Sequence, residues 1–173
     1  MPCPYSLMHY IKAEKSEYFW YNRKGKREKS HQPKITNLTQ RVKPIMPKWK
    51  VMTEFTFDSA HYIKDYNGPC GRLHGHTYRV QIEAISEQLH SSEFCPHPVM
   101  VADFRSLKWA KKDVTKGGLD HCVLNEVMPP EYETTAEMIA KYIYDETKKR
   151  IPSDIQLKVR VSETPNSWAE YEE

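Results

Sequence analysis

Two stretches of alternating apolar and polar residues set the strongest limit on how this chain folds. Residues 49–61 alternate with a period of two, and residues 74–84 do the same. This period is typical of half-buried strands. Between them, Asn67-Gly68-Pro69 supplies turn residues that break the extended pattern. The sequence therefore predicts an antiparallel hairpin whose parity decides which side chains share the buried face.

Three histidines fall on the apolar parity of these two strands. His74 and His76 are two residues apart, so both imidazoles leave the same face, and His61 continues the apolar parity of the first strand. If the strands pair as a hairpin, the three rings converge at the rim of the core. Three imidazoles with a fourth position left open are a ligand set of catalytic zinc. Cys70, four residues before His74, is expected beside this metal.

Other arrangements of these residues stay open at this point. The histidines could form a structural cluster without metal, and Cys70 could be a fourth ligand that closes the site into a structural one. Cys95 and His97 also have ligand-like spacing, but Pro96 separates them and no partner pair comes later in the chain.

The distribution of charge suggests a basic segment attached to an acidic body. Residues 1–48 hold 11 Lys and Arg against 3 Glu, a balance of +8, whereas residues 49–173 have a balance of −5. We therefore predict a basic, Pro-containing N-terminal extension over 1–48 and a catalytic domain over 49–173. The asymmetry favours an appended segment over a nucleic-acid-binding domain. The extension could bind RNA through aromatics next to Arg and Lys, or pack on the body or a neighbouring subunit.

Composition and cysteine usage indicate a soluble protein of the cytoplasm. A 39% hydrophobic share with 28% charged residues is ordinary for a globular domain. No apolar run approaches the ~20 residues that span a bilayer, and the basic N-terminal stretch lacks a signal-peptide pattern. The four cysteines are widely scattered, so reduced thiols are expected.

Two helices are predicted after the hairpin. Asp103 is expected to cap the first, which Gly117-Gly118 ends. The T-x-x-E box over Thr134–Glu137 is expected to cap the second. Their apolar stripes are Phe104, Leu107, Ala110 and Val114 for the first, and Ile139, Ala140, Ile143 and Thr147 for the second.

The end of the chain returns to the strand pattern. Residues 155–161 alternate with period two, and Glu163 falls on their apolar parity. A carboxylate on that face must find donors, because burying it unpaired costs several kcal/mol. It could pair with an internal Arg or Lys, or bind the N–H edge of a ligand. With residues 87–99 as an irregular connection, the element order is ββααββ, an α+β fold with a four-stranded antiparallel sheet and two helices on one face.

Four ordered motifs connect these patterns to one family. They are FDSAH, which ends at His61, CGRLHGHTY over Cys70–Tyr78, LDH, which ends at His121, and SETP over Ser162–Pro165. Together they resemble the 6-pyruvoyltetrahydropterin synthase / 6-carboxytetrahydropterin synthase family over nearly everything beyond the basic extension. A cysteine four residues before the HGH pair is similar to the 6-carboxytetrahydropterin synthase branch, which acts in queuosine biosynthesis.

The resemblance implies a role for each matched residue. The implied zinc ligands are His61, His74 and His76. The implied proton-transfer residues are Cys70, as the thiol base, and His121 with Asp120 before it. The implied substrate-binding residues are Glu163, which anchors the pterin, and Thr135, in a loop that family members place near the pterin of a neighbouring subunit. Lys64, Arg72 and Arg79 are nearby candidates for holding a triphosphate.

The resemblance also implies an assembly and a reaction. The family has the T-fold, whose subunits close into ring-forming homo-oligomers, here expected to be a hexamer with active sites between subunits. The expected activity is that of a zinc-dependent lyase that converts 7,8-dihydroneopterin triphosphate to 6-carboxy-5,6,7,8-tetrahydropterin, acetaldehyde and triphosphate. The alternatives are a 6-pyruvoyltetrahydropterin synthase, a folate-route side-chain cleavage of the same substrate, and a zinc-stabilised RNA-binding module.

Overall fold

The computed structural model describes residues 20–21, 27–28 and 48–173. The chain divides into two compact units, Met1–Pro44 and Ile45–Glu173. In the first unit, β1 (Trp20–Tyr21) pairs antiparallel with β2 (Arg27–Glu28). The other residues of the predicted basic extension, apart from Lys48, lie outside the described ones, so its role stays a prediction.

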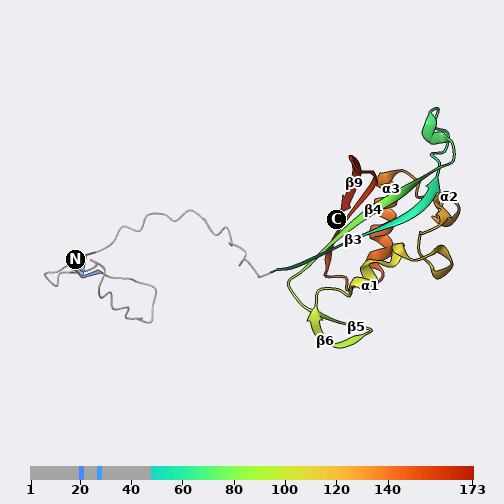
Figure 1. The fold of residues 1–173 in the computed structure, drawn as a ribbon. Coiled ribbons are helices and arrows are strands. Elements are labelled where there is room, and N and C mark those ends of the chain that lie inside the picture. The colour runs from blue at the N-terminus through green and yellow to red at the C-terminus, as the bar shows by residue number, and fades with distance from the viewer. Residues whose placement is uncertain (1–19, 22–26, 29–47) are drawn as a thin grey trace. The chain divides into compact units, whose positions relative to one another are not determined.

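A five-stranded sheet, in the order β7-β3-β4-β8-β9, is the centre of the second unit (Figure 1). Its strands are β3 (Trp49–His61), β4 (His74–Ser86), β7 (Cys122–Val123), β8 (Gln156–Thr164) and β9 (Ser167–Glu172). Four of them are antiparallel neighbours, whereas β7 pairs parallel with β3 at Ser59 and Ala60. The predicted α+β class and antiparallel strands are present. The fifth strand was missed because two residues are too few to show a period.

The hairpin of β3 and β4 has the register that the sequence predicts. Trp49 lies opposite Ser86 at one end, and His61 lies opposite His74 at the other. One parity of each strand is buried and the other is exposed. The buried side chains of the sheet include Phe55, Phe57, Tyr78, Val80, Ile82, Leu157, Val159 and Val161. The histidines at the paired ends of β3 and β4 therefore lie on the same face of the sheet as the hydrophobic core.

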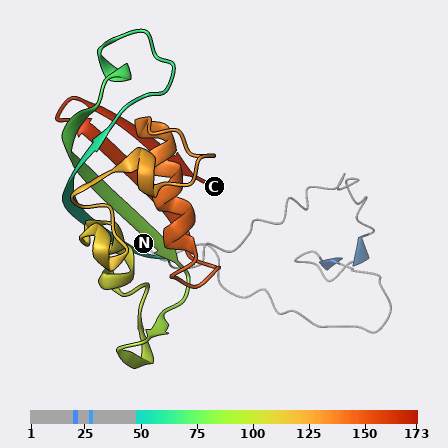
Figure 2. The same ribbon diagram turned by 90° about the vertical axis from the view of Figure 1, so that its right-hand side faces the viewer.

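Helix α3 (Ala136–Lys148) covers that face and packs against β8 and β9 (Figure 2). Its buried stripe follows the predicted helical spacing and consists of Ile139, Ala140, Ile143, Tyr144 and Thr147. The N-cap is Thr135, whose hydroxyl accepts a hydrogen bond from the backbone N–H of Met138. The capping box predicted over Thr134–Glu137 is therefore displaced by one residue, because the Thr134 hydroxyl bonds to the backbone of Tyr62 instead.

The first predicted helix is shorter than its apolar stripe suggests. Asp103 caps it as expected, but α1 (Phe104–Leu107) ends after one turn and two 3₁₀ turns follow. The cause is Trp109, which is buried and donates from Nε1 to Thr147 Oγ1 of α3 at 2.9 Å. A continuous helix with Leu107 inward would turn Trp109 to its far side, so the backbone leaves helical geometry between them.

Two smaller elements complete the described part of the chain. Residues 87–99, predicted as an irregular connection, instead contain a hairpin of β5 (His90–Ser92) and β6 (Cys95–Met100). The Ser92 hydroxyl accepts hydrogen bonds from the backbone N–H groups of Phe94 and Cys95 and so stabilises the turn. Helix α2 (Leu124–Val127) is one turn that follows β7. Within the described ranges, no helix is both long enough and apolar enough to cross a membrane.

The buried hydroxyl of Tyr78, in the central sheet, leads to a prediction about stability. Tyr78 stacks on Phe57 with ring centroids 5.0 Å apart, and among the described residues its hydroxyl has no hydrogen-bond partner. An unsatisfied buried hydroxyl costs about 1–3 kcal/mol. Tyr78→Phe is therefore expected to raise the free energy of unfolding by about 1 kcal/mol in urea denaturation.

The matched control is Tyr132→Phe. The Tyr132 hydroxyl donates to Asp145 at 2.7 Å, so its removal is expected to lower the free energy of unfolding. If Tyr78→Phe proved less stable than the wild type, the Tyr78 hydroxyl would have to find a partner in the protein in solution.

Candidate metal centre

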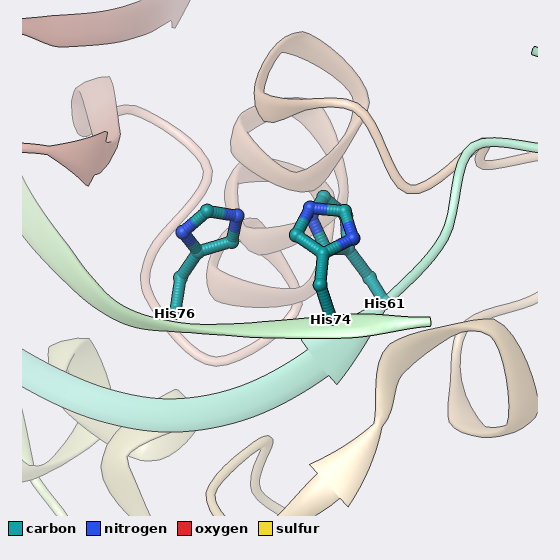
Figure 3. Close-up of side chains that lie close together, drawn as sticks. All are labelled: His61, His74 and His76. Carbon is teal, nitrogen blue, oxygen red and sulfur yellow. The ribbon is translucent and has the colours of Figure 1, made fainter. Parts of the chain in front are cut away.

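The ends of β3 and β4 bring three imidazoles together. His61 and His74 are direct cross-strand partners, and His76 lies one step further along β4, opposite Ser59. The rings rise from the same side of the two strands (Figure 3). One ring nitrogen from each histidine lies within 4.8 Å of the corresponding atoms of the other two. The hairpin register thus builds a compact group of three nitrogen donors.

Backbone carbonyls fix the hydrogens of two of these rings. His61 Nδ1 lies 2.6 Å from the carbonyl oxygen of Thr134, and His74 Nδ1 lies 2.7 Å from that of Arg72. A carbonyl oxygen only accepts, so each Nδ1 carries a hydrogen and donates it. In the neutral rings, Nε2 is then left with a lone pair. This arrangement is typical of histidines that bind a metal through Nε2.

The two Nε2 atoms face each other at a distance that fits a shared cation. His61 Nε2 lies 3.1 Å from His74 Nε2. Two lone pairs cannot hydrogen-bond each other, so this contact requires either a shared proton or a metal ion between the rings. Two nitrogens on a tetrahedral zinc lie roughly 3.3 Å apart. With His76 as the third donor, the residues fit a three-histidine zinc site.

Burial keeps one ring of the cluster neutral. His61 is 1% exposed, and removal from solvent lowers its pKa, because the charged form loses more hydration than the neutral form. A neutral imidazole is the form that binds a metal.

Glu163 is the only acidic side chain within ion-pair distance of this cluster in the described part of the chain. Its Oε1 lies 3.8 Å from His61 Nε2. Within residues 48–173, no Lys or Arg pairs with it, so the internal pairing with a basic residue that the sequence left open is not found there. The carboxylate stays a quarter exposed at the strand end, where its acceptor oxygens can reach a ligand.

The structure does not bring the Cys70 sulfur into the ring cluster. Cys70 lies in a single 3₁₀ turn, Pro69–Gly71, within the loop that joins β3 to β4. This loop projects beyond the strand ends (Figures 1 and 2). It is closed on itself by a bond from Ile63 N to Cys70 O at 2.8 Å. Among the described residues, the donors that lie within 4.8 Å of one another are the three histidines, and the half-buried Cys70 thiol is not one of them. Cys70, Cys95 and Cys122 are free thiols.

Asp120 and His121 form an ion pair at the outer edge of β3, also outside the cluster. Asp120 Oδ2 lies 2.8 Å from His121 Nδ1, and the imidazole is 70% exposed. The backbone of β3 holds both residues, since Asp58 N donates to Asp120 Oδ1 at 2.8 Å and Asp58 O accepts from His121 N at 2.7 Å. That bond from Asp58 lowers the pKa of Asp120. The Asp120 carboxylate in turn raises the pKa of His121.

The Asp120–His121 ion pair leads to a prediction about the pKa of His121. Asp120→Asn is expected to lower the His121 pKa toward its ordinary value of 6.5, because the carboxylate that favours the imidazolium is lost. An NMR titration of the ring protons measures the change. With a raised folded-state pKa, the stabilisation from the pair is full below pH 6.5 and is lost as the pH rises through the folded-state value. Asp113→Asn, a weaker contributor to the same shift, is the control and should change the pKa less.

The remaining predicted substrate-binding residues lie in three places. Thr135 caps α3, next to the carbonyl that orients His61. Lys64 and Arg72 belong to the exposed Cys70 loop. Arg79 points to the exposed side of β4, where it pairs with Glu54 at 2.7 Å, so the structure gives it no path to the cluster in its own chain. Thr134 was missed as a contributor, because a backbone carbonyl that orients a ring leaves no mark in the sequence.

Comparison with known proteins identifies the family. The sequence profile of the family described as 6-pyruvoyl tetrahydropterin synthase matches residues 50–173. A 6-carboxy-5,6,7,8-tetrahydropterin synthase from Haemophilus influenzae is 34% identical over 147 residues, with 72% of this chain and 99% of the relative covered. A protein of the same name from Synechocystis is 33% identical, with 71% of this chain and 92% of the relative covered.

A solved structure agrees at the level of the fold. The 6-pyruvoyl tetrahydropterin synthase of Caenorhabditis elegans superposes with a TM-score of 0.56 at 22% identity, and the match covers 74% of this chain and 97% of that one. The residues that the profile matches, 50–173, include α3 and the histidine cluster. The chain therefore belongs to the 6-pyruvoyl tetrahydropterin synthase family of enzymes.

Proposed function

We propose that this protein is a zinc-dependent lyase that converts 7,8-dihydroneopterin triphosphate to 6-carboxy-5,6,7,8-tetrahydropterin, releasing acetaldehyde and triphosphate, in queuosine and 7-deazapurine biosynthesis. The observation that carries the proposal is the facing pair of Nε2 atoms in the three-histidine cluster. The names of the relatives from H. influenzae and Synechocystis support the reaction. The cysteine four residues before the HGH pair supports the same branch.

The cluster and Glu163 are proposed to bind the substrate together. Zinc held by His61, His74 and His76 would supply a Lewis acid for the hydroxyls of the substrate side chain. Glu163, at the strand end beside His61, accepts two N–H bonds from the aminopyrimidine edge of the pterin, a bidentate geometry that fixes the ring. Thr135 lies at the start of α3, from where its hydroxyl can reach a bound pterin. These contacts orient the three-carbon side chain over the cluster.

Proton transfer is proposed to use Cys70 and His121. Cys70 takes a proton from the side chain as the thiolate. The Asp120 carboxylate keeps His121 in its acid form to a higher pH, so this ring delivers the complementary proton. Both residues lie outside the cluster of their own chain. We therefore propose that sites form between copies in a ring-shaped homo-oligomer, a hexamer as the family resemblance implies.

Product analysis tests the reaction. Purified protein loaded with zinc is incubated with 7,8-dihydroneopterin triphosphate, and the products are identified by mass. 6-Carboxy-5,6,7,8-tetrahydropterin together with acetaldehyde is the expected result. 6-Pyruvoyltetrahydropterin would instead show the pyruvoyl-type synthase, and the absence of any pterin product would refute the proposal.

A second candidate is cleavage of the same side chain to 6-hydroxymethyl-dihydropterin, as on the folate route. A relative from Pyrococcus furiosus that is named dihydroneopterin monophosphate aldolase favours it. This relative is 32% identical over 111 residues. The same mass analysis separates the candidates, since the aldolase reaction releases no acetaldehyde and leaves a hydroxymethyl group on the ring where the lyase leaves a carboxyl group. The named relatives are enzymes, so the RNA-binding module is not proposed.

A further inference from the structure

Asn125 of α2 holds the end of β3 next to the histidine cluster, and the proposed function gives it no role. Its Oδ1 accepts from Tyr62 N at 2.9 Å, and its Nδ2 donates to Tyr62 O at 2.8 Å. Nδ2 also donates to Thr134 Oγ1 at 3.0 Å. Tyr62 directly follows His61 in the chain. One carboxamide therefore joins the backbone after His61 to the loop before α3.

Thr134 continues this chain of contacts to the ring itself. Its hydroxyl donates to Tyr62 O at 2.8 Å, and its carbonyl oxygen lies 2.6 Å from His61 Nδ1. Thr134 is buried, so its own side chain is shielded from solvent. Because the bond at Nδ1 sets the rotation of the imidazole, the position of the Thr134 carbonyl decides where Nε2 points.

We infer that Asn125 and Thr134 form a clamp that positions His61 and thereby sets the metal affinity of the cluster. The inference rests on the proposed zinc site. Without the carboxamide, both backbone groups of Tyr62 lose a partner and the Thr134 hydroxyl loses its donor. The Thr134 carbonyl can then shift, and Nε2 of His61 turns from its place opposite His74. Loss of a partner that orients a metal-binding histidine typically lowers metal affinity about 10- to 100-fold.

Two buried threonines allow the clamp to be separated from general stability. Thr147, like Thr134, is buried, and its hydroxyl accepts from Trp109 Nε1 at 2.9 Å and donates to Ile143 O at 2.6 Å. It lies near the opposite end of α3, whose 13 residues span about 20 Å. At either position, Thr→Val removes one buried hydroxyl and leaves a side chain of nearly the same size. Only Thr134 contacts His61.

Zinc titration of four variants tests the clamp. Asn125→Leu, Thr134→Val, Thr134→Ser and Thr147→Val are titrated against a chromophoric chelator, and the absorption spectrum of the cobalt-loaded proteins is recorded. We expect Asn125→Leu and Thr134→Val to lose about 10- to 100-fold in zinc affinity and to change the cobalt spectrum. Thr134→Ser, which keeps the hydroxyl, should restore both. Thr147→Val should lower the melting temperature and change neither.

The inference is overturned if Asn125→Leu and Thr134→Val bind zinc as the wild type does, or if Thr147→Val weakens zinc binding as much as they do. If Asn125→Leu does not fold, the pair Thr134→Val and Thr134→Ser decides. Product formation by the wild type is followed in parallel. If the variants lose zinc affinity as expected but the wild type forms no pterin product, the proposed function is refuted and the inference about the clamp still holds. A wild type that binds no zinc refutes both.

Discussion

His74→Ala is expected to abolish stoichiometric zinc binding, and turnover with it, while the domain stays folded. His74 supplies one of three converging nitrogens, and its Nε2 lies 3.1 Å from that of His61. Two imidazoles alone do not hold zinc in a catalytic site, which uses three protein ligands. The loss of affinity should exceed the roughly 100-fold upper figure for residues one step removed from the metal. Zinc content by mass spectrometry, together with product formation, measures the outcome.

The fold is expected to survive this change because His74 is only half-buried at a strand end. His61 is a poorer test, since it is almost fully buried and its removal leaves a cavity. His90→Ala is the matched control. His90 pairs with Asp154 at 3.2 Å and is not part of the cluster, so this variant should keep both zinc and activity. Zinc bound at full stoichiometry by His74→Ala would contradict the three-histidine centre.

The strand parity explains why the centre could be predicted from the sequence. A period of two places alternate residues on one face whatever their partners are. His74, His76 and the apolar residues after them therefore had to share a face once β4 formed. The position of His61 needed one further condition, the hairpin register, and the structure meets it with the pair His61 and His74. The helical stripe of α3 was predicted for the same reason, since a single strong period covers its whole length.

Long-range contacts explain what the sequence could not predict. The helix expected after Asp103 breaks because Trp109 is bonded to Thr147, which lies 38 residues further along the chain. The position of Cys70 is set by the loop, not by its distance from His74. In that loop, a side chain at Gly71 would come within 2.2 Å of the Tyr66 carbonyl oxygen, so the tight turn requires glycine. Neither the Trp109–Thr147 bond nor the close approach of Gly71 to Tyr66 produces a periodic pattern in the sequence.

The clamp on His61 was hidden for a related reason. Asn125 and Thr134 act through backbone groups of Tyr62 and through one carbonyl oxygen. Tyr62 lies 63 residues before Asn125 and 72 before Thr134, and the parallel pairing of β7 with β3 brings the segment after His121 alongside β3. Partners of this kind become visible when the hydrogen bonds of each metal-binding ring are followed outward.

Cys70→Ala and His121→Ala are each expected to be nearly inactive and to regain activity when their subunits are mixed. Removing a group that transfers a proton costs about 10²–10⁴ in kcat. Neither residue lies in the cluster of its own chain, so in the proposed site His121 comes from a neighbouring copy. Random mixing of the two variants then restores roughly a quarter of the sites, those that take Cys70 from one variant and His121 from the other.

The experiment depends on subunit exchange. The two proteins are unfolded together and refolded, native mass spectrometry confirms mixed oligomers, and product formation is measured. Cys70→Ala mixed with Cys70→Ser is the control, because no combination of these chains supplies a thiol. If the mixed oligomers stay as inactive as the two parent variants, Cys70 and His121 of each site must come from the same chain. The loop of Cys70 would then have to move to the His121 of its own chain, past the edge of β3 where Asp58 holds Asp120 and His121. Recovery of activity would instead show that one site takes Cys70 and His121 from two different copies.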